Sequence, residues 1–139
     1  MLCQKGAKSG MKNAQRILIV DDEESMRLLL RRVLESNPAL EITLASGGDE
    51  ALNLTAERRY DLILLDLLMP GIGGIEVLTR IRGESANRKT PVIVVSVMTD
   101  TPTKIACASL GVSDYLVKPI DREAVLAAVN RVVTGSSGQ

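Results

Sequence analysis

Charged and hydroxyl side chains stand at the ends of four short apolar segments of the sequence. They are Asp21, Asp22, Asp66, Ser96 and Lys118. Carboxylates gathered in one place raise each other's pKa unless positive charge compensates. Mg²⁺ suits such a group, because it prefers oxygen ligands and is commonly held by a few carboxylates and a phosphate. The chain has no histidine, which disfavours a zinc or copper centre.

The same side chains meet the needs of phosphoryl transfer, in which catalysis is mainly positioning and charge neutralisation. Asp66 would be the nucleophile and would form an acyl phosphate. Mg²⁺ and Lys118 would neutralise the phosphoryl oxygens, and the Ser96 hydroxyl would donate a hydrogen bond to one of them. The residue types therefore predict a phosphoryl-accepting site, provided that the fold brings them together.

Apolar segments and helical patterns alternate along the chain and would position these residues. Strands are expected at residues 17–20, 42–45, 62–65, 92–95 and 115–117. Helices are expected from Met26 to near Asn37, from Ala51, over 75–81, from a Thr101 cap to about Gly111, and from an Asp121 cap to about Val133. Five βα units predict an α/β fold, a doubly wound parallel sheet with five helices. Ligands bind beyond the carboxyl ends of such strands, where the site residues would meet.

Length and composition limit the alternatives. The 139 residues suit one domain, expected at 16–134, with a flexible extension at 1–15 and a flexible tail at 135–139. The formal net charge is zero, so no overall field attracts nucleic acid. No apolar run is long enough to span a membrane, and two isolated cysteines fit a reducing cytoplasm.

Four motifs resemble the receiver domains of bacterial two-component response regulators, in particular single-domain, chemotaxis-regulator-like receivers. They are ILIVDDE at 17–23, DLILLDLLMPGIGG at 61–74, PVIVVS at 91–96 and DYLVKP at 114–119. Intervals of 44, 30 and 22 residues separate Asp22, Asp66, Ser96 and Lys118 in turn, as the family pattern requires. The resemblance covers roughly residues 15–134 and implies the flavodoxin-like strand order 2-1-3-4-5.

The resemblance also implies how the metal and the phosphoryl group are held. Asp66 would be the phosphoacceptor. Asp21 and Asp22 would form the acidic pair, with Asp22 and Asp66 as direct Mg²⁺ ligands and the backbone carbonyl of Leu68 as the third ligand from the protein.

The resemblance also implies roles for four further residues. Lys118 would contact the phosphoryl group, and its bond to Pro119 would be cis, which is uncommon elsewhere. Ser96 would be the hydroxyl switch residue and Tyr115 the aromatic rotamer switch. Two plainer interpretations stay open: Ser96 satisfying backbone groups at a strand end, and Tyr115 as an ordinary half-buried strand residue.

Three departures from the family pattern lie around the expected site. Gly73 stands where the family often has Asp, which predicts altered loop behaviour rather than lost function. Val97 replaces the usual Ala or Gly and would crowd the mouth of the site. Leu68 and Met98 are apolar where polar residues are common, and apolar groups would not hold an attacking water. Slow dephosphorylation is the resulting hypothesis.

Several functions compete with a phosphorylated receiver. The alternatives are an unphosphorylated pseudo-receiver that serves as a scaffold, a phosphatase with a nucleophilic Asp, and a flavin-binding electron carrier. Leu68 stands where such phosphatases need a second acid, and the run from Asp21 to Glu24 would repel a flavin phosphate.

The expected signalling partners follow from the resemblance. A histidine kinase or phosphotransfer protein would donate the phosphoryl group, and the protein itself would not be an enzyme. Phosphorylation would shift the face formed by the helix after Thr101, the strand at 115–117 and the last helix. Output would be contact with an unknown downstream protein, from a monomer or weak dimer, without direct binding of nucleic acid or membrane.

Overall fold

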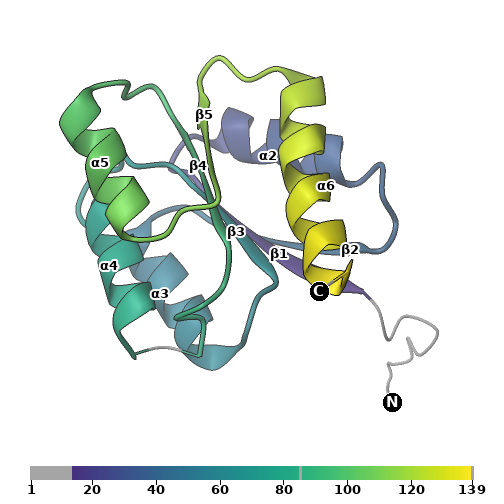
Figure 1. The fold of residues 1–139 in the computed structure, drawn as a ribbon, viewed down its shortest axis with the longest axis horizontal. Helices are drawn as coiled ribbons and strands as arrows, with labels where there is room; N and C mark the ends of the chain where they lie inside the picture. Colours follow the sequence, from purple (N-terminus) through teal and green to yellow (C-terminus); the bar gives the residue numbers. More distant parts are fainter. Residues whose placement is uncertain (1–13, 85, 139) are drawn as a thin grey trace.

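The computed structural model describes residues 14–84 and 86–138 and shows a three-layer α/β arrangement (Figure 1). A five-stranded parallel sheet forms the middle layer, with the strand order β2-β1-β3-β4-β5. Helices α3, α4 and α5 cover one face, and α2 and α6 cover the other. The doubly wound fold, its strand order and its five helices are confirmed.

The five strands are short, as expected for a buried parallel sheet. They are β1 (Gln15–Val20), β2 (Leu40–Ala45), β3 (Leu62–Leu65), β4 (Val92–Ser96) and β5 (Asp114–Val117). The helices are α2 (Glu24–Leu34), α3 (Gly48–Glu57), α4 (Gly74–Glu84), α5 (Thr101–Ser109) and α6 (Arg122–Gly138). Every expected element is present, and most bounds differ from the prediction by one to three residues.

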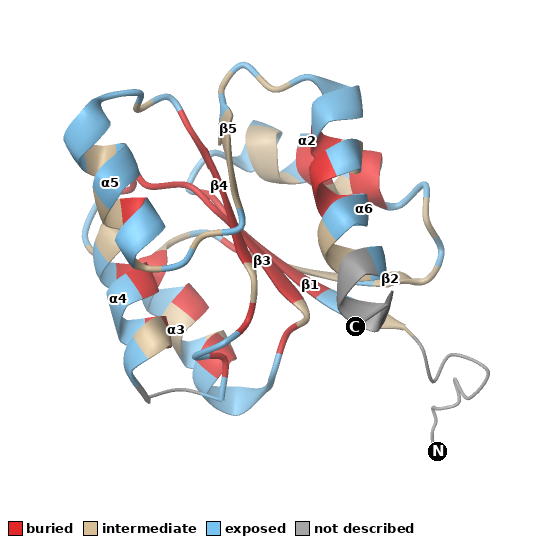
Figure 2. Ribbon diagram, in the orientation of Figure 1, coloured by how far each residue is buried: buried red, intermediate tan, exposed pale blue. Residues whose placement is uncertain are grey.

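Two apolar clusters, one on each face of the sheet, form the core. In β1, Leu18 and Val20 belong to the cluster beneath α3, α4 and α5, whereas Ile17 and Ile19 belong to the cluster beneath α2 and α6. Successive side chains of a strand point to opposite faces. A strand covered on both faces must therefore be apolar where it is covered, and Figure 2 shows β3, β4 and the carboxyl-terminal part of β1 buried.

The structure corrects the expected start of α5. Thr101 is the first residue of this helix, and Asp100 is its N-cap, where the carboxylate accepts a hydrogen bond of 3.0 Å from the backbone N–H of Thr103. Aspartate caps a helix at least as well as threonine, and Pro102 is tolerated in the first turn. The expected end is confirmed, because Gly111 has φ of +73°, the left-handed conformation that favours glycine.

Differences at the two ends of the domain are small. β1 begins at Gln15, one residue inside the expected extension, while residues 1–13 lie outside the described part of the chain. The expected end of the last helix near Val133 is wrong, since α6 continues to Gly138. Glycine costs about 1 kcal/mol in a helix, but neither serine nor glycine blocks a helix as proline does. The domain boundaries and the flexibility of the ends stay predictions.

Two local features at the start of α6 agree with the sequence. The Asp121 carboxylate accepts a hydrogen bond of 3.1 Å from Ala124 N–H, which confirms it as a cap. The bond between Lys118 and Pro119 is cis, as the resemblance implies. Within the described ranges, every helix is too short or too polar to cross a lipid bilayer.

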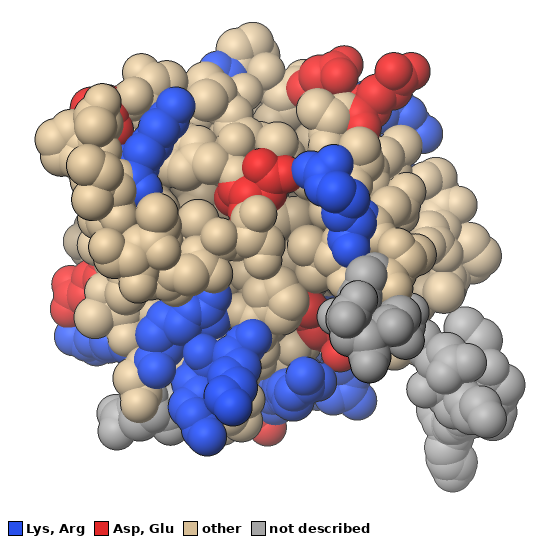
Figure 3. Space-filling view, in the orientation of Figure 1, with Lys and Arg blue, Asp and Glu red and all other residues tan. Residues whose placement is uncertain are grey.

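Charge is unevenly distributed although the formal net charge is zero. Figure 3 shows Lys and Arg side chains gathered at the lower edge of the view, where the loops before β3 and β4 lie in Figure 1. The exposed basic residues of these loops are Arg58, Arg59, Arg88 and Lys89. They lie at the amino ends of the strands, opposite the edge where the site residues were expected.

Candidate functional site

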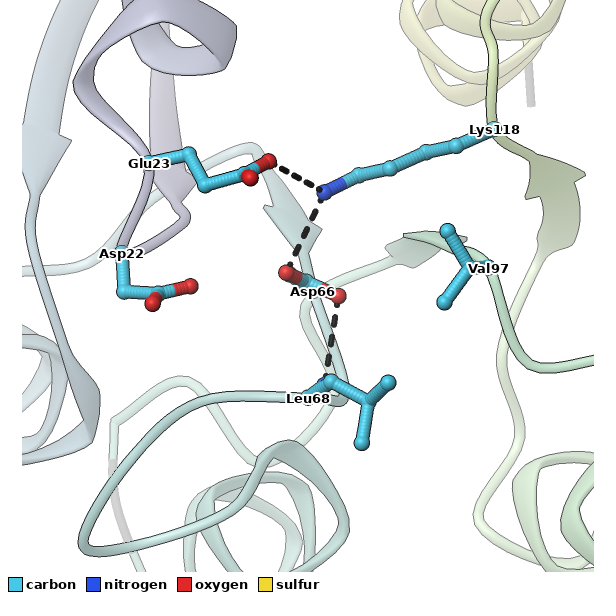
Figure 4. Close-up of a pocket in the computed structure, with 6 residues that line it drawn as sticks. All are labelled: Asp22, Glu23, Asp66, Leu68, Val97 and Lys118. Carbon is cyan, nitrogen blue, oxygen red and sulfur yellow. Dashed lines mark hydrogen bonds and ion pairs between the residues drawn. The ribbon is translucent and has the colours of Figure 1, made fainter.

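An open pocket of about 200 Å³ lies at the carboxyl ends of β1, β3, β4 and β5. Its lining residues are Asp22, Glu23, Asp66, Leu68, Val97 and Lys118 (Figure 4). The strands end at one edge because they are parallel and in register, with Val20 opposite Leu65 and Leu65 opposite Val94. Residues up to 97 positions apart in the chain thereby share one site.

Three carboxylates meet beside this pocket. Oxygen atoms of Asp21, Asp22 and Asp66 lie within 4.8 Å of one another, close enough for one metal ion to contact all three. Asp21 and Asp66 are buried, whereas Asp22 is exposed and can turn toward a ligand. Hard oxygen donors of this kind fit Mg²⁺. The pocket is also lined by Leu68, the residue whose carbonyl the sequence proposes as a further ligand.

Lys118 holds the acidic group together. Its Nζ donates to Asp21 Oδ2 at 2.9 Å and to Asp66 Oδ2 at 3.2 Å, and it pairs with Glu23 Oε1 at 3.5 Å. The side chains of Lys118, Asp21 and Asp66 are only 9%, 2% and 5% exposed, so the contacts among these three are little screened by solvent. The ammonium group therefore stands between the two buried carboxylates, at the place where a phosphoryl group on Asp66 would carry its charge.

Burial and charge shift the pKa values of this pair in the direction that favours nucleophilic chemistry. Burial raises the pKa of Asp66, and the negative charge of Asp21 raises it further. The hydrogen bonds from Leu68 N–H and Lys118 lower this pKa, but they do not cancel the increase. Burial alone would lower the pKa of Lys118, but its hydrogen bond to Asp21 and the nearby carboxylates raise the pKa overall. Lys118 thus stays charged, while Asp66 is more basic than an ordinary aspartate.

Backbone contacts fix both buried carboxylates. Asp21 Oδ1 accepts from Glu23 N–H at 2.9 Å, and Asp66 Oδ1 accepts from Leu68 N–H at 3.2 Å. Arg27, on the first turns of α2, donates to the backbone carbonyl of Asp21 at 2.6 Å. Sequence reasoning did not single out Glu23 or Arg27, although Arg27 lies one helical turn beyond the acidic run and its spacing is a usable signal.

Ser96 and Tyr115 lie behind the pocket rather than in its lining. Ser96 is fully buried, and its hydroxyl oxygen accepts from Met98 N–H at 3.3 Å. The Tyr115 hydroxyl donates to the Met98 carbonyl at 2.7 Å, and Lys104 stands 5.5 Å from the Tyr115 ring. Both candidate switch residues therefore contact the backbone of Met98, on the loop that follows β4.

Two exposed apolar side chains flank the mouth of the pocket. Leu68 is 52% exposed and Val97 is 55% exposed, and both line the opening (Figure 4). Met98 is half-buried and packs against the core instead. Leu68 and Val97, two of the residues that depart from the family pattern, thus lie at the entrance to the site. Met98 contacts Ser96 and Tyr115 through its backbone instead.

Two glycines in the loop after β3 differ in how much space they have. A Cβ on Gly74 would lie 2.4 Å from the carbonyl oxygen of Asp66, so only glycine fits there without moving the site backbone. A Cβ on Gly73 would meet nothing closer than the Leu67 carbonyl oxygen at 3.7 Å. The packing around the backbone at position 73 therefore does not require glycine there.

Comparison with known proteins agrees with this geometry. The family model for the response regulator receiver domain matches residues 17–130, and the chain belongs to this family. Among curated relatives, the transcriptional regulatory protein ResD of Bacillus subtilis is 40% identical over 126 residues, covering 90% of this chain and 50% of ResD. SrrA of Staphylococcus aureus is 41% identical over 111 residues, covering 79% of this chain and 44% of SrrA. The chain spans about half the length of these relatives.

Solved structures match over a larger share of their own chains. The chemotaxis response regulator CheY4 of Vibrio cholerae has a TM-score of 0.77 and 30% identity, covering 85% of this chain and 98% of CheY4. The receiver domain of the Francisella response regulator 1452 has a TM-score of 0.79 and 32% identity, covering 88% and 98%. The described fold is thus that of a receiver domain, a two-component signalling module.

Proposed function

We propose that this receiver accepts a phosphoryl group on Asp66 from a histidine kinase or a phosphotransfer protein. The observation that carries the proposal is the position of the Lys118 ammonium group, bonded to Asp21 at 2.9 Å and to Asp66 at 3.2 Å. A buried lysine shared by two carboxylates beside an open pocket supplies charge neutralisation where an acyl phosphate would form.

The proposed step is a transfer between two side chains. A carboxylate oxygen of Asp66 attacks the phosphorus atom and forms a new O–P bond. The P–N bond to the donor histidine breaks, and its electron pair stays on the imidazole nitrogen. Lys118 keeps its proton throughout, because its pKa is raised, and bonds a phosphoryl oxygen of the acyl phosphate. The product remains on the protein, which is therefore a signalling acceptor rather than an enzyme.

Mg²⁺ is the proposed cofactor. Asp22, Asp66 and the backbone carbonyl of Leu68 would hold it directly, with Asp21 completing the acidic group. When bound, the ion would supply Lewis-acid neutralisation of the phosphoryl charge. The cluster of three carboxylate oxygens within 4.8 Å supports this assignment, since a cation offsets their mutual repulsion.

Output is proposed to run through the face formed by α5, β5 and α6. Tyr115 of β5 bonds the Met98 carbonyl, which links this face to the loop beside the pocket. Ile105 on α5 is 61% exposed and Val117 on β5 is 41% exposed, so the face carries apolar contacts for another protein. A monomer or weak dimer acting by protein contact in the cytoplasm, without direct contact to nucleic acid, is the function we infer.

Intact mass tests phosphorylation directly. The protein is incubated with Mg²⁺ and acetyl phosphate, and a gain of one phosphoryl group is expected in the wild type but not in Asp66→Asn. Removal of Mg²⁺ by a chelator is expected to abolish the gain. An unmodified wild type, with or without Mg²⁺, would instead support a scaffold that works without phosphorylation. Steady release of phosphate from many substrate molecules would support the phosphatase alternative.

The apolar entrance predicts a long-lived acyl phosphate. Leu68 and Val97 offer an attacking water no hydrogen-bonding group at the mouth of the pocket. Leu68→Asn is therefore expected to shorten the lifetime of the phosphorylated protein several-fold, and Val97→Ala to speed its phosphorylation by small donors. Loss of the added mass is followed over time after removal of the donor. A wild-type half-life of only seconds would reject the hypothesis.

A further inference from the structure

Glu23 occupies the N-cap position of α2 without acting as a cap. Its backbone is extended, with φ of −91° and ψ of 117°, and its side chain makes no capping hydrogen bond. Ser, Thr, Asp and Asn stabilise this position by bonding a free N–H of the first turn, and glutamate is not among the preferred residues. Helix formation alone therefore does not explain a glutamate at position 23.

The carboxylate of Glu23 is instead directed at the site. Figure 4 shows it pointing toward the Lys118 ammonium group from another direction than Asp66, and its Oε1 lies 3.5 Å from Lys118 Nζ. The backbone N–H of Glu23 is bonded to Asp21 Oδ1 at 2.9 Å, which fixes where the side chain starts. The Glu23 side chain is 62% exposed, so it can leave Lys118 at little cost.

We propose that Glu23 is a positioning residue that holds the Lys118 ammonium group in the resting site and releases it when a phosphoryl group enters. The inference rests on the proposed phosphorylation of Asp66. The side chains of Asp21 and Asp66 are buried, whereas Glu23 is the exposed member of the three carboxylate partners of Lys118. It is therefore the partner that an incoming phosphoryl group displaces.

The Glu23 carboxylate then opposes the arrival of negatively charged donors. It lines the pocket, and it competes with the phosphoryl oxygens for the same ammonium group. Repulsion between two charges grows in proportion to their product, so a dianionic donor is slowed more than a monoanionic donor. Glu23 would thus favour delivery by a protein partner over reaction with small anionic phosphodonors.

Phosphorylation rates of Glu23→Gln test this proposal, measured at Mg²⁺ concentrations high enough that the rate no longer changes. Acetyl phosphate serves as the dianionic donor and phosphoramidate as the monoanionic donor. The rate constant for Glu23→Gln is expected to rise about fivefold with acetyl phosphate and about twofold with phosphoramidate, as for a charge several ångströms from the phosphoryl group. Added salt should shrink both gains.

Glu24→Gln is the matched control, because Glu24 is an exposed acid in the first turn of the same helix. It is expected to change neither rate by more than about 1.5-fold, since solvent screens a more distant charge. Glu23→Asp keeps the charge and should stay near the wild type. Equal gains with both donors, or no difference between Glu23→Gln and Glu24→Gln, would overturn the role of Glu23. A wild type that takes up no phosphoryl group would instead overturn the function on which the proposal rests.

Discussion

The two edges of the sheet are built in opposite ways. At the amino edge, Asn87 is fully buried, and its described partners include four neutral groups. Its amide donates to the carbonyls of Thr55 and Arg58 at 2.8 and 2.9 Å, and its oxygen accepts from Tyr60 N–H at 2.7 Å and from the Thr90 hydroxyl at 3.0 Å. A buried amide with every group paired specifies one arrangement of the surrounding loops.

At the same edge, the charged side chain of Arg82 also bonds backbone groups of the surrounding loops. Arg82, at the end of α4, donates to four backbone carbonyls, those of Arg88, Thr90, Leu110 and Gly111. The contacts to Leu110 and Thr90 are both 2.7 Å. The guanidinium group thereby ties the end of α4 to the end of α5 and to the start of β4.

The carboxyl edge is held together much less completely. Asp21 and Asp66 are buried next to each other and share one ammonium group, while Leu68 and Val97 expose apolar surface. Like charges in a buried place raise the energy of the folded state unless a ligand compensates. This protein is therefore stabilised at the amino edge of its sheet and kept reactive at the carboxyl edge.

Removal of Asn87 is expected to have the largest effect on stability. Asn87→Ala leaves buried backbone groups of Thr55, Arg58 and Tyr60 without their partner, which should lower the free energy of unfolding by about 3 kcal/mol. Urea unfolding measures this loss, and Asn130→Ala on the exposed face of α6 is the control. Phosphorylation of the folded fraction should be unchanged. A variant that keeps full stability but loses phosphorylation would contradict the division between the two edges.

Removal of Lys118 is expected to weaken both stability and function. Lys118→Met leaves two buried carboxylates without their cation, which should lower the free energy of unfolding by about 2 kcal/mol at neutral pH. The loss should shrink as the pH falls and the carboxylates become protonated. Phosphorylation by acetyl phosphate should slow about 100-fold, as for loss of one group that stabilises transition-state charge. A rate within a few-fold of the wild type would show that Lys118 has only a structural role.

Removal of the charge of Asp66 is expected to act in the opposite direction. The pKa of Asp66 is raised above its ordinary 3.8, so the folded state binds this proton more tightly than the unfolded state. Stability linked to this group is present at low pH and is lost as the pH rises through the raised pKa. Asp66→Asn should therefore raise the melting temperature by a few degrees at neutral pH in metal-free buffer.

The same variant separates charge from metal binding. The gain in melting temperature should vanish below the ordinary pKa of an aspartate, where the wild-type side chain is also neutral. Added Mg²⁺ should stabilise the wild type more than Asp66→Asn, because the variant lacks a ligand. Equal melting temperatures of the wild type and Asp66→Asn across the whole pH range would show that the charge of Asp66 does not destabilise the folded protein.

The smallest effect is expected at Tyr60. This residue is fully buried, and among the described residues its hydroxyl has no hydrogen-bond partner. Tyr60→Phe removes a buried hydroxyl group that makes no hydrogen bond among the described residues. The free energy of unfolding should therefore stay within about 0.5 kcal/mol of the wild type or increase. Chemical denaturation checks this. A loss above about 1.5 kcal/mol would show that the hydroxyl takes part in the amino-edge network after all.

Most of the fold and the central residues of the candidate site were predictable from the sequence. The buried hydrogen bonds that hold the surrounding loops in place were not. The apolar runs ending in Asp21, Asp66 and Ser96 place these residues at one sheet edge by the geometry of parallel strands alone. Asn87 lies in a polar stretch between a helix and a strand, where no periodicity marks it as buried. The hydrogen bond between Tyr115 and Met98 joins strand β5 to the loop after β4, and the spacing of these two residues in the sequence does not predict it.

The class of this protein follows from its sequence, because strand and helix periods are local properties and four motifs lie in the order that one family uses. How the charges of the site are shared follows from tertiary contacts that the sequence does not reveal. Lys118 pairs with three carboxylates. One of them belongs to Glu23, whose side chain contacts Lys118 and makes no capping hydrogen bond to α2. Such choices depend on distances of a few ångströms between residues far apart in the chain, which no local pattern encodes.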